Sequence, residues 1–389
     1  MQYIFKQMVF KRQQEFKELQ GESCVLWGPR QTGKSTLLRN SFPRSPVYDL
    51  LRSDLFFNFT KQPSLLREEI LGLNDKSLPV IVDEIQKVPA LLDEIHWLME
   101  NEKIRFVLSG SSPRKIIRSG GNMLGGRLIR YQLLPLIYPE IPDFDLIRAL
   151  NNGLLPKHYL SSSPRMLTRS YIGDYLQEEI MQEAFIRKVP SFSRFLEMAA
   201  FSNGEIINYS NIARDCGVSM PSVKEYFQIL SDTLVGKFIY PYQKRPKRRI
   251  VLAPKFYYFD VGVANALLNR GRIETGSELF GKAFEQFIFQ ELTAHSHYSH
   301  ISYPITYWRT SSQQEVDFIL GSNEVAVEVK GTSVVNASHL SGLHAFMEEY
   351  KVKHAIIISL DQKPRVIGKI SVLPWKHFLE KLWSGEIIK

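Results

Sequence analysis

Cysteine and long apolar runs are scarce in this 389-residue sequence, and each shortage excludes a class of protein. The two cysteines, Cys24 and Cys216, lie far apart and have no metal-ligand residues beside them. A disulfide framework and a zinc site built on cysteine are therefore excluded, and the expected location is the reducing cytoplasm. No uninterrupted apolar run approaches the roughly 18–20 residues of a membrane helix. Charged residues also interrupt the first twenty positions, so neither a membrane partner nor a secretory signal is expected.

Acidic residues are fewer than basic ones, 40 Asp and Glu against 49 Lys and Arg, which gives a formal net charge of +9. The excess lies in one short segment, because the sequence between Asp232 and Asp260 holds seven basic residues and no acidic one. Residues 256–389, by contrast, hold 13 basic and 14 acidic side chains, a net charge of −1. A local basic patch indicates a phosphate-rich partner. We expect five of its residues to contact DNA: Lys244, Arg245, Lys247, Arg248 and Arg249.

Between residues 23 and 150, short apolar runs alternate with stretches long enough to hold helices. Each run has about the length of a buried strand, and the alternation is typical of a parallel sheet covered by helices on both faces. The predicted strands are Ser23–Trp27, Pro46–Leu50, Pro79–Val82, Ile104–Leu108 and Leu128–Leu133.

The pattern changes after Phe192, where three helical stretches precede the basic segment, which has an apolar run on either side. Three helices followed by a two-stranded basic hairpin are a winged helix-turn-helix in outline. The alternative is a winged helix that binds protein and has a merely solvated basic hairpin. We expect three domains: an α/β domain at 1–155, a helical linker with the winged helix at 156–255, and a small α/β domain at 256–389.

A phosphate-binding motif follows the first predicted strand. Residues 28–35 fit the pattern G-x-x-x-x-G-K-[ST], and a helix is predicted to begin there. Such a loop turns backbone N–H groups toward phosphate oxygens, and the helix N-terminus adds the positive end of its dipole. Lys34 is expected to reach the β- and γ-phosphates of ATP, and the Ser35 hydroxyl to bind Mg²⁺. The predicted nucleotide-binding residues are Gly28, Pro29, Arg30, Gln31, Thr32, Gly33, Lys34, Ser35 and Thr36.

Two carboxylates, Asp83 and Glu84, follow the strand predicted at Pro79–Val82. Charges at the end of a buried strand are costly unless a cation or a water requires them. Asp83 is expected to hold Mg²⁺ through water and Glu84 to polarise the attacking water, a pair that indicates hydrolysis. The alternative for Asp83 is a helix N-cap. Ser109, after the next strand, would orient the water or contact the γ-phosphate, or else belongs to a simple Ser/Gly turn.

An arginine is also expected to neutralise the charge that develops on the γ-phosphate. Arg127 is the first choice, either within its own chain or supplied by a neighbour, and Arg30 and Arg114 compete for the role. A solvated surface position is the alternative for each of the three. Supply from a neighbour would require a homo-oligomer, which the sequence leaves open.

The motifs occur in a specific order: Gly-Pro-Arg-Gln-x-Gly-Lys-Ser, Val-Asp-Glu-Ile-Gln, Leu-Ser-Gly-Ser-Ser, Gly-Gly-Arg, Leu-Leu-Pro-Leu, then further ones at 255–262, 284–285, 308–310, 315–318 and 328–330. This series resembles a large family of bacterial and archaeal AAA-type ATPases over nearly the whole chain. The resemblance implies a P-loop NTPase sheet of the additional-strand type, in which the strand before Asp83 is not adjacent to the strand before the P-loop. It also implies a winged helix-turn-helix and then a small domain similar to restriction-endonuclease-like nucleases.

A second set of charged residues lies in a hairpin predicted between residues 315 and 330. Because side chains alternate along a strand, Asp317 faces away from its apolar neighbours, and Glu328 and Lys330 share a face. Asp317 and Glu328 are expected to bind Mg²⁺ through oxygen, with Glu285 on the preceding helix as a further ligand. Lys330 would orient or deprotonate a water that attacks a phosphodiester. The alternative is a nuclease fold that kept binding and lost cleavage.

These motifs are compatible with two main hypotheses of function. The first is a Mg²⁺-dependent, ATP-hydrolysing AAA-type protein that engages DNA through its basic winged helix and carries a nuclease-like domain. The second is a nucleotide-gated switch whose C-terminal domain recognises a partner without cleaving it. A small-molecule kinase is a weaker third hypothesis, because Glu84 beside Asp83 is typical of hydrolysis.

Overall fold

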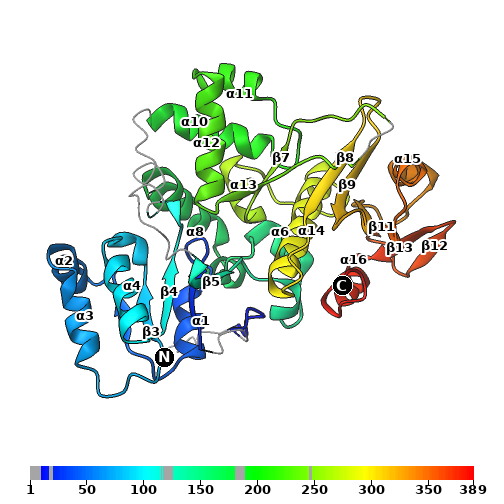
Figure 1. Ribbon diagram of the computed structural model, residues 1–389. Helices are drawn as coiled ribbons and strands as arrows, with labels where there is room; N and C mark the ends of the chain where they lie inside the picture. Colours follow the sequence, from blue (N-terminus) through cyan, green and yellow to red (C-terminus); the bar gives the residue numbers. More distant parts are fainter. Residues whose placement is uncertain (1–9, 17–20, 115, 117–125, 180–188, 245–247) are drawn as a thin grey trace, which may run out of the picture.

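The computed structural model describes residues 10–16, 21–114, 116, 126–179, 189–244 and 248–389. The elements form an N-terminal module built on strands β1 to β5, a middle module from α6 to α13, and a C-terminal module from α14 to α16. Figure 1 shows the two large sheets at opposite ends of the molecule, with α14 between them. Within the described part of the chain, no helix has both the length and the apolar character needed to cross a membrane.

The N-terminal module is a five-stranded parallel sheet with strand order β2-β3-β4-β1-β5. All five predicted strands are confirmed, with bounds that shift by at most two residues, and β1, β3 and β4 are buried throughout. Strand β4 lies between β1 and β3, the separation that the family resemblance implies. The carboxyl ends of β1, β3 and β4 therefore meet at one edge of the sheet. The elements are β1 (Ser23–Trp27), α1 (Lys34–Ser41), β2 (Val47–Asp49), α2 (Ser53–Lys61), α3 (Ser64–Leu71), β3 (Val80–Asp83), α4 (Leu91–Asn101), β4 (Phe106–Gly110) and β5 (Leu128–Gln132).

The middle module contains the three predicted helices, α10 (Val189–Phe201), α11 (Tyr209–Cys216) and α12 (Met220–Asp232). A tight turn joins α11 to α12, because Gly217 takes the left-handed conformation (φ 65°) and the Ser219 side chain caps α12. An antiparallel pair of strands follows, so the predicted element order is present, and a winged helix stays a prediction. The other elements are α6 (Leu146–Asn152), α7 (Pro156–Leu160), α8 (Pro164–Ser170), the π-helical segment η4 (Tyr171–Glu179), β6 (Gly236–Ile239), β7 (Lys255–Tyr258) and α13 (Val261–Leu267).

The C-terminal module is a six-stranded mixed sheet with strand order β12-β13-β11-β10-β9-β8. The predicted hairpin is confirmed, with β9 antiparallel to β10 and Val327 opposite Phe318. Helices α14 and α16 share a buried core with one face of the sheet, and α15 covers the other face. Strands β12 and β13 and helix α16 were not predicted. The elements are α14 (Glu278–Tyr298), β8 (Ile305–Arg309), β9 (Glu315–Leu320), β10 (Val325–Val329), η5 (Ala337–Leu340), α15 (Ser341–Glu349), β11 (His354–Ser359), β12 (Arg365–Ile367), β13 (Ile370–Pro374) and α16 (Trp375–Trp383).

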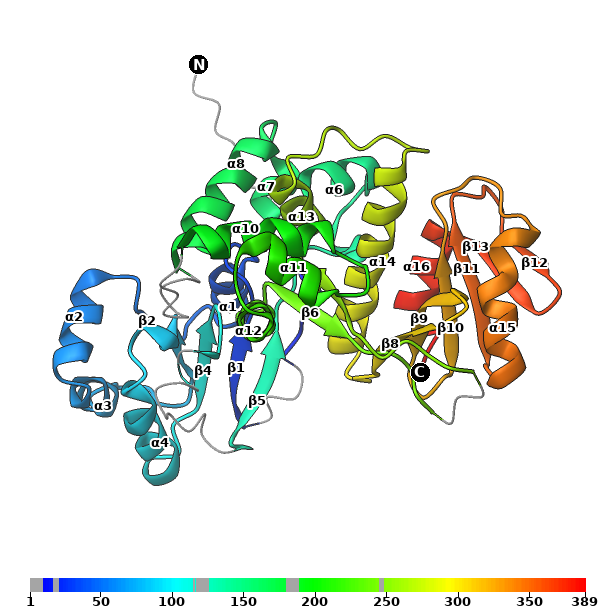
Figure 2. The same cartoon turned by 90° about the horizontal axis from the view of Figure 1, so that it is seen from above.

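The connection between β6 and β7 differs from the compact basic hairpin that the sequence predicts. On its way out it pairs with the edge strand β8, where the Tyr242 N–H donates to the Tyr307 carbonyl at 2.7 Å. On its way back the Val251 N–H donates to the Arg309 carbonyl at 2.9 Å. Figure 2 shows this connection extending from β6 toward the C-terminal sheet. Strand β8 is the last strand of its sheet, so its outer edge has backbone groups that no other strand of the sheet pairs with. The connection between β6 and β7 forms hydrogen bonds with these groups, which a short hairpin standing free of the sheet would not do.

Candidate nucleotide site and C-terminal carboxylate cluster

The loop between β1 and α1 has the backbone shape that the motif predicts. Gly33 takes a positive φ of 95°, a conformation that glycine adopts without strain. At Gly28 the backbone approaches Leu133, the residue that follows β5, so closely that a Cβ atom would lie 2.3 Å from the Leu133 carbonyl oxygen. Gly33 is thus favoured by the conformation of the loop, and Gly28 is required by the close approach of the neighbouring chain.

Lys34 lies across this loop. Its Nζ donates to the carbonyl oxygens of Gly28 at 2.8 Å and Pro29 at 3.3 Å, and its side chain is buried. Burial lowers the pKa of Lys34, and the negative charges of Glu84 and Asp83 partly offset this effect. A phosphate oxygen inside the loop would be a stronger acceptor for this ammonium than the two carbonyls are.

Side chains from α1, β3 and β4 meet at the Asp83 carboxylate, which is buried at the end of β3. The Ser35 hydroxyl donates to Oδ2 of Asp83 at 2.6 Å, and the Ser109 hydroxyl donates to Oδ1. Hydroxyl and carboxylate oxygens placed together are the ligand type that Mg²⁺ prefers. Ser35 and Asp83 therefore fit the metal that the motif implies.

Glu84 combines a strained backbone with a fixed side chain. Its φ of 58° and ψ of 44° lie in the left-handed region, which costs about 1–3 kcal/mol for a residue other than glycine. The Gln86 amide donates to Glu84 Oε2 at 2.5 Å and to Ser111 Oγ at 2.9 Å, all within buried surroundings. Gln86 and Ser111 were not predicted as site residues, although both belong to the motifs that follow β3 and β4.

Arg12, which was also not predicted as a site residue, forms hydrogen bonds with the backbone of the P-loop. Its guanidinium donates to the Thr32 carbonyl at 2.5 Å and to the Leu134 carbonyl at 2.6 Å. Its Nε forms an ion pair with Glu140 at 2.9 Å, and the two side chains are 6% and 0% exposed. No local pattern around Arg12 indicates this contact, because its partners lie 20 to 128 positions away.

The structure does not bring Arg127 to the nucleotide site. The next residue, Leu128, pairs with Ser23 at the start of β1, so Arg127 lies at the opposite edge of the sheet from the P-loop. Its Nε donates to Glu100 at 2.6 Å, and both side chains are about half exposed. A role for Arg127 within its own chain is therefore wrong, and supply from a neighbour stays a prediction.

The two competing arginines lie nearer to the site. Arg30, in the P-loop, stacks over the Tyr175 ring at 5.6 Å from its centroid. Arg114 follows β4 and forms an ion pair with Asp232 at the end of α12. Ser112 donates to the Asp232 backbone carbonyl at 3.4 Å. The end of β4, which carries Ser109, is thus joined directly to the middle module, and Figure 1 shows α12 standing above the sheet.

The five basic residues predicted to contact DNA have different surroundings. Lys244 and Arg249 are exposed, and Arg245 and Lys247 lie outside the described residues. Arg248 donates to Glu348 at 2.5 Å and to Glu349 at 2.9 Å. A DNA contact by Arg248 stays a prediction, and such a contact would compete with the two carboxylates of α15 that pair with this side chain.

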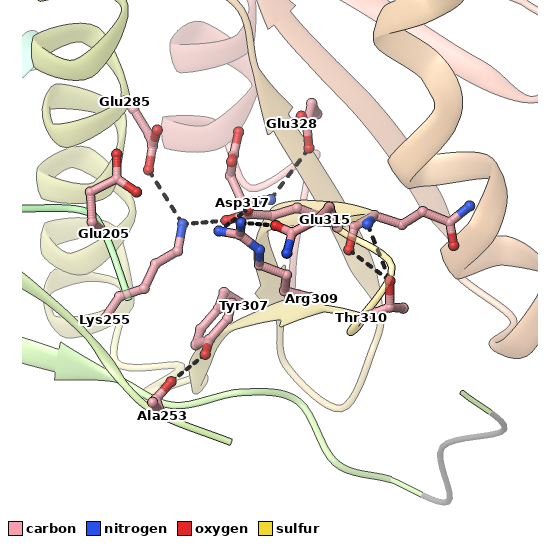
Figure 3. Close-up of polar contacts among 12 residues, drawn as sticks. Glu205, Ala253, Lys255, Glu285, Tyr307, Arg309, Thr310, Glu315, Asp317 and Glu328 are labelled. Carbon is pink, nitrogen blue, oxygen red and sulfur yellow. Dashed lines mark hydrogen bonds and ion pairs between the residues drawn. The ribbon is translucent and has the colours of Figure 1, made fainter. Parts of the chain in front are cut away.

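The C-terminal charged residues converge where α14 passes the β9–β10 hairpin, as Figure 3 shows. Asp317 accepts the Val329 N–H at 2.8 Å, and Lys330 Nζ lies 2.6 Å from Glu328 Oε1. Burial, reinforced by the charge of Asp317, raises the pKa of Glu285 to about 7 and that of Glu328 to about 8. The predicted residues are thus brought together and shifted in pKa, as is common at functional sites.

Lys255, which was not predicted as a site residue, enters this cluster from β7. Its Nζ lies 2.6 Å from Glu315 Oε1 and 3.9 Å from Glu285 Oε1 (Figure 3). Among the described residues, no three or more His, Cys, Asp or Glu side chains are arranged to hold a metal ion. The metal site predicted from Asp317, Glu328 and Glu285 is therefore not formed in this arrangement. Lys330 pairs with Glu328 instead, and Lys255 lies beside Glu285.

Comparison with known protein families divides the chain into three parts. Residues 20–142 match the model of an AAA domain. Residues 143–274 match a domain of unknown function, DUF8612, and residues 280–378 match a second one, DUF4143. The P-loop, Asp83, Glu84 and Ser109 all fall within the first match, so an ATP-binding, AAA-type ATPase is supported for the N-terminal module.

Two curated relatives and one solved structure are similar to parts of this chain. The uncharacterized proteins Rv2008c of Mycobacterium tuberculosis and Mb2031c of Mycobacterium bovis are each 25% identical over 324 residues, which cover 81% of this chain and 71% of theirs. Among solved structures, a Walker-type ATPase of Pyrococcus abyssi matches with a TM-score of 0.40 and 14% identity, covering 64% of this chain and 92% of its own.

Proposed function

We propose that residues 28–36 bind ATP with Mg²⁺ and that the chain hydrolyses it. The observation that carries this proposal is the meeting of Ser35 and Ser109 on the Asp83 carboxylate, beside the buried Lys34. The N–H groups of the loop and Lys34 would hold the phosphates, and Ser35 and Asp83 would hold Mg²⁺. When bound, Mg²⁺ would supply positive charge that offsets the negative charge of the phosphates.

Glu84 is the residue that we assign to the attacking water. Its carboxylate is one residue from Asp83 and is held by Gln86, so it has a fixed direction at the sheet edge. In hydrolysis it would orient the water and polarise its O–H bond. The water oxygen bonds to the γ-phosphorus as the bond from this phosphorus to the bridging oxygen of ADP breaks, and ADP and phosphate are released.

Two substitutions test this assignment. Lys34→Ala is expected to weaken ATP binding, because it removes the only buried cation described in the loop. Glu84→Gln is expected to retain ATP binding and to slow turnover by roughly 10²–10⁴-fold, the usual contribution of a general base. Phosphate release and nucleotide affinity would be measured for both variants. Turnover that is equal in the wild type and in Lys34→Ala would contradict the proposal.

For the output of the ATPase, we favour the nucleotide-gated switch over a DNA-cleaving enzyme. Arg114 and Ser112, which follow β4 near the nucleotide site, contact Asp232 in α12. A change at the nucleotide site could therefore move or restrain α12 through these contacts. The carboxylates of the C-terminal module, by contrast, are paired with Lys255 and Lys330. A winged-helix role for the middle module and a restriction-endonuclease-like origin for the C-terminal module remain part of this proposal.

DNA is the partner proposed for the switch, through the exposed Lys244 and Arg249 and their neighbours Arg245 and Lys247. ATP turnover with and without single-stranded and duplex DNA, scored also for cleavage products, tests this choice. We expect DNA to change the turnover rate and no cleavage to occur. Mg²⁺-dependent cleavage that is lost in Asp317→Ala and in Lys330→Ala would establish the nuclease hypothesis instead.

A further inference from the structure

Lys255 is a buried cation from one module placed among the carboxylates of another. It begins β7 of the middle module, is 3% exposed, and reaches Glu315 and Glu285 of the C-terminal module. An ammonium in such surroundings is stable only when it is paired. The charges of Glu285, Glu315 and Asp317 raise the pKa of Lys255 even though burial lowers it.

The cluster is close to neutral without any added ion. Four carboxylates, those of Glu285, Glu315, Asp317 and Glu328, face three cations. The cations are Lys255, Lys330 and Arg309, which lie 2.6, 2.6 and 3.0 Å from their carboxylate partners. A divalent ion among the same oxygens would therefore have to displace an ammonium or lie beside one, against the repulsion of like charges.

A second contact fixes β7 in this position. Tyr257 lies two residues after Lys255 and on the same face of the strand, and its hydroxyl donates to Glu285 Oε1 at 2.5 Å. Glu285 thus receives two side chains from β7. Withdrawal of Lys255 from the cluster would require this strand to move as a unit against α14.

We propose that Lys255 is the resident cation of the carboxylate cluster, and that its ammonium excludes divalent metal ions from the place where a nuclease-like site would hold one. The contact acts as an intrachain block: while β7 is docked, the C-terminal module binds no catalytic metal. This inference goes beyond the proposed ATPase and does not depend on it, because metal binding is measured without nucleotide.

The test measures Mn²⁺ binding to the full chain. The concentration of free Mn²⁺ is read from its electron paramagnetic resonance signal, which decreases as the ion binds. All variants carry Asp83→Asn, so that the P-loop does not contribute a metal site. With Lys255 present, we expect no bound ion at this cluster over the Mn²⁺ concentrations used. Lys255→Met keeps an unbranched side chain and removes the charge, and is expected to bind one Mn²⁺ per chain, at least roughly tenfold more tightly than any residual binding by the protein with Lys255. Addition of Asp317→Asn should abolish this binding.

A second variant, in which one cation and one carboxylate are removed together, keeps the test valid if the first variant does not fold. If Lys255→Met is unfolded by circular dichroism, Lys255→Met with Glu315→Gln removes one cation and one carboxylate together, and the same gain of Mn²⁺ binding is expected. Lys255→Arg keeps the positive charge and should bind no ion. The proposal is overturned if the protein with Lys255 binds Mn²⁺ as tightly as the Lys255→Met variant, or if no folded variant without this lysine gains an ion.

Discussion

At the scale of single residues, Arg12 connects three parts of the N-terminal module. One guanidinium donates to the P-loop through Thr32, to the chain after β5 through Leu134, and to Glu140. Because the loop must keep its backbone N–H groups directed at phosphate, a donor that fixes one of its carbonyls also fixes the adjacent peptide planes. We therefore expect Arg12 to position the loop for nucleotide binding.

Arg12→Ala is expected to destabilise the protein by roughly 3 kcal/mol, because the buried Glu140 carboxylate loses the cation with which it forms an ion pair. It should also weaken ATP binding, because Thr32 loses its donor. Chemical denaturation and the affinity for an ATP analogue would measure the two effects. Lys11→Ala, an exposed neighbour, is the matched control and should change neither. Normal nucleotide affinity in folded Arg12→Ala would disprove the positioning role.

Glu291 is a second single residue with a measurable consequence, because burial raises its pKa to about 8. Its carboxylate accepts from the Tyr138 N–H at 2.7 Å and from the Trp383 indole at 2.9 Å. A carboxyl whose folded pKa is raised binds its proton more tightly in the folded state. Its contribution to stability is therefore complete below the usual range near 4.5 and is lost as the pH rises toward 8.

We expect the thermal unfolding midpoint of the wild type to fall between pH 5 and pH 8 more steeply than that of Glu291→Gln, by up to about one proton in the linkage slope. The glutamine keeps the acceptor for Tyr138 or Trp383 and cannot ionise. Glu278→Gln, at the exposed start of the same helix, serves as the control. Identical slopes in the wild type and in Glu291→Gln would show that Glu291 does not titrate differently on unfolding.

At the scale of elements, the sequence predicted what short-range patterns encode. The five parallel strands, the P-loop between β1 and α1, and the β9–β10 hairpin depend on apolar periodicity and on glycines that stand next to them in the chain. Lys255 and Arg12 could not be found in this way, because their partners are distant in sequence. The docking of the β6–β7 connection on β8 was missed for the same reason, since a free strand edge is visible only in the folded sheet.

Helix α12 carries the prediction that belongs to this scale. A bound γ-phosphate would fix Ser109 and the end of β4, and through Arg114 it would restrain α12 at Asp232. A non-hydrolysable ATP analogue is therefore expected to slow hydrogen exchange of the amides in α12, and Asp232→Ala should remove most of this effect while ATP affinity is retained. Asp215→Ala, exposed at the end of α11, is the control. Equal protection in Asp232→Ala and the wild type would exclude this path.

At the scale of the whole molecule, the net charge of +9 overstates the surface that is available to a polyanion. Arg248 is neutralised by Glu348 and Glu349, and Lys255 is buried in the carboxylate cluster. Both belong to the seven basic residues between Asp232 and Asp260. The basic segment is also held against the C-terminal sheet at β8, so its exposed lysine and arginine side chains lie at the junction of two modules.

DNA binding should therefore depend on some of these basic residues and not on others. The double variant Lys244→Gln with Arg249→Gln is expected to weaken binding and to reduce the slope of log affinity against log salt by up to about 1.8, since each phosphate contact contributes roughly 0.9 on B-DNA. Arg248→Gln should leave the slope unchanged, because the Arg248 guanidinium already forms ion pairs with the carboxylates of Glu348 and Glu349. Lys363→Gln with Lys369→Gln, exposed around β12, matches the double variant in charge and should have no effect. Fluorescence anisotropy on a short duplex at several salt concentrations separates these cases. If the control pair lowers the slope as much as the double variant does, the attraction is a property of the net charge, and the β6–β7 connection is not the DNA site.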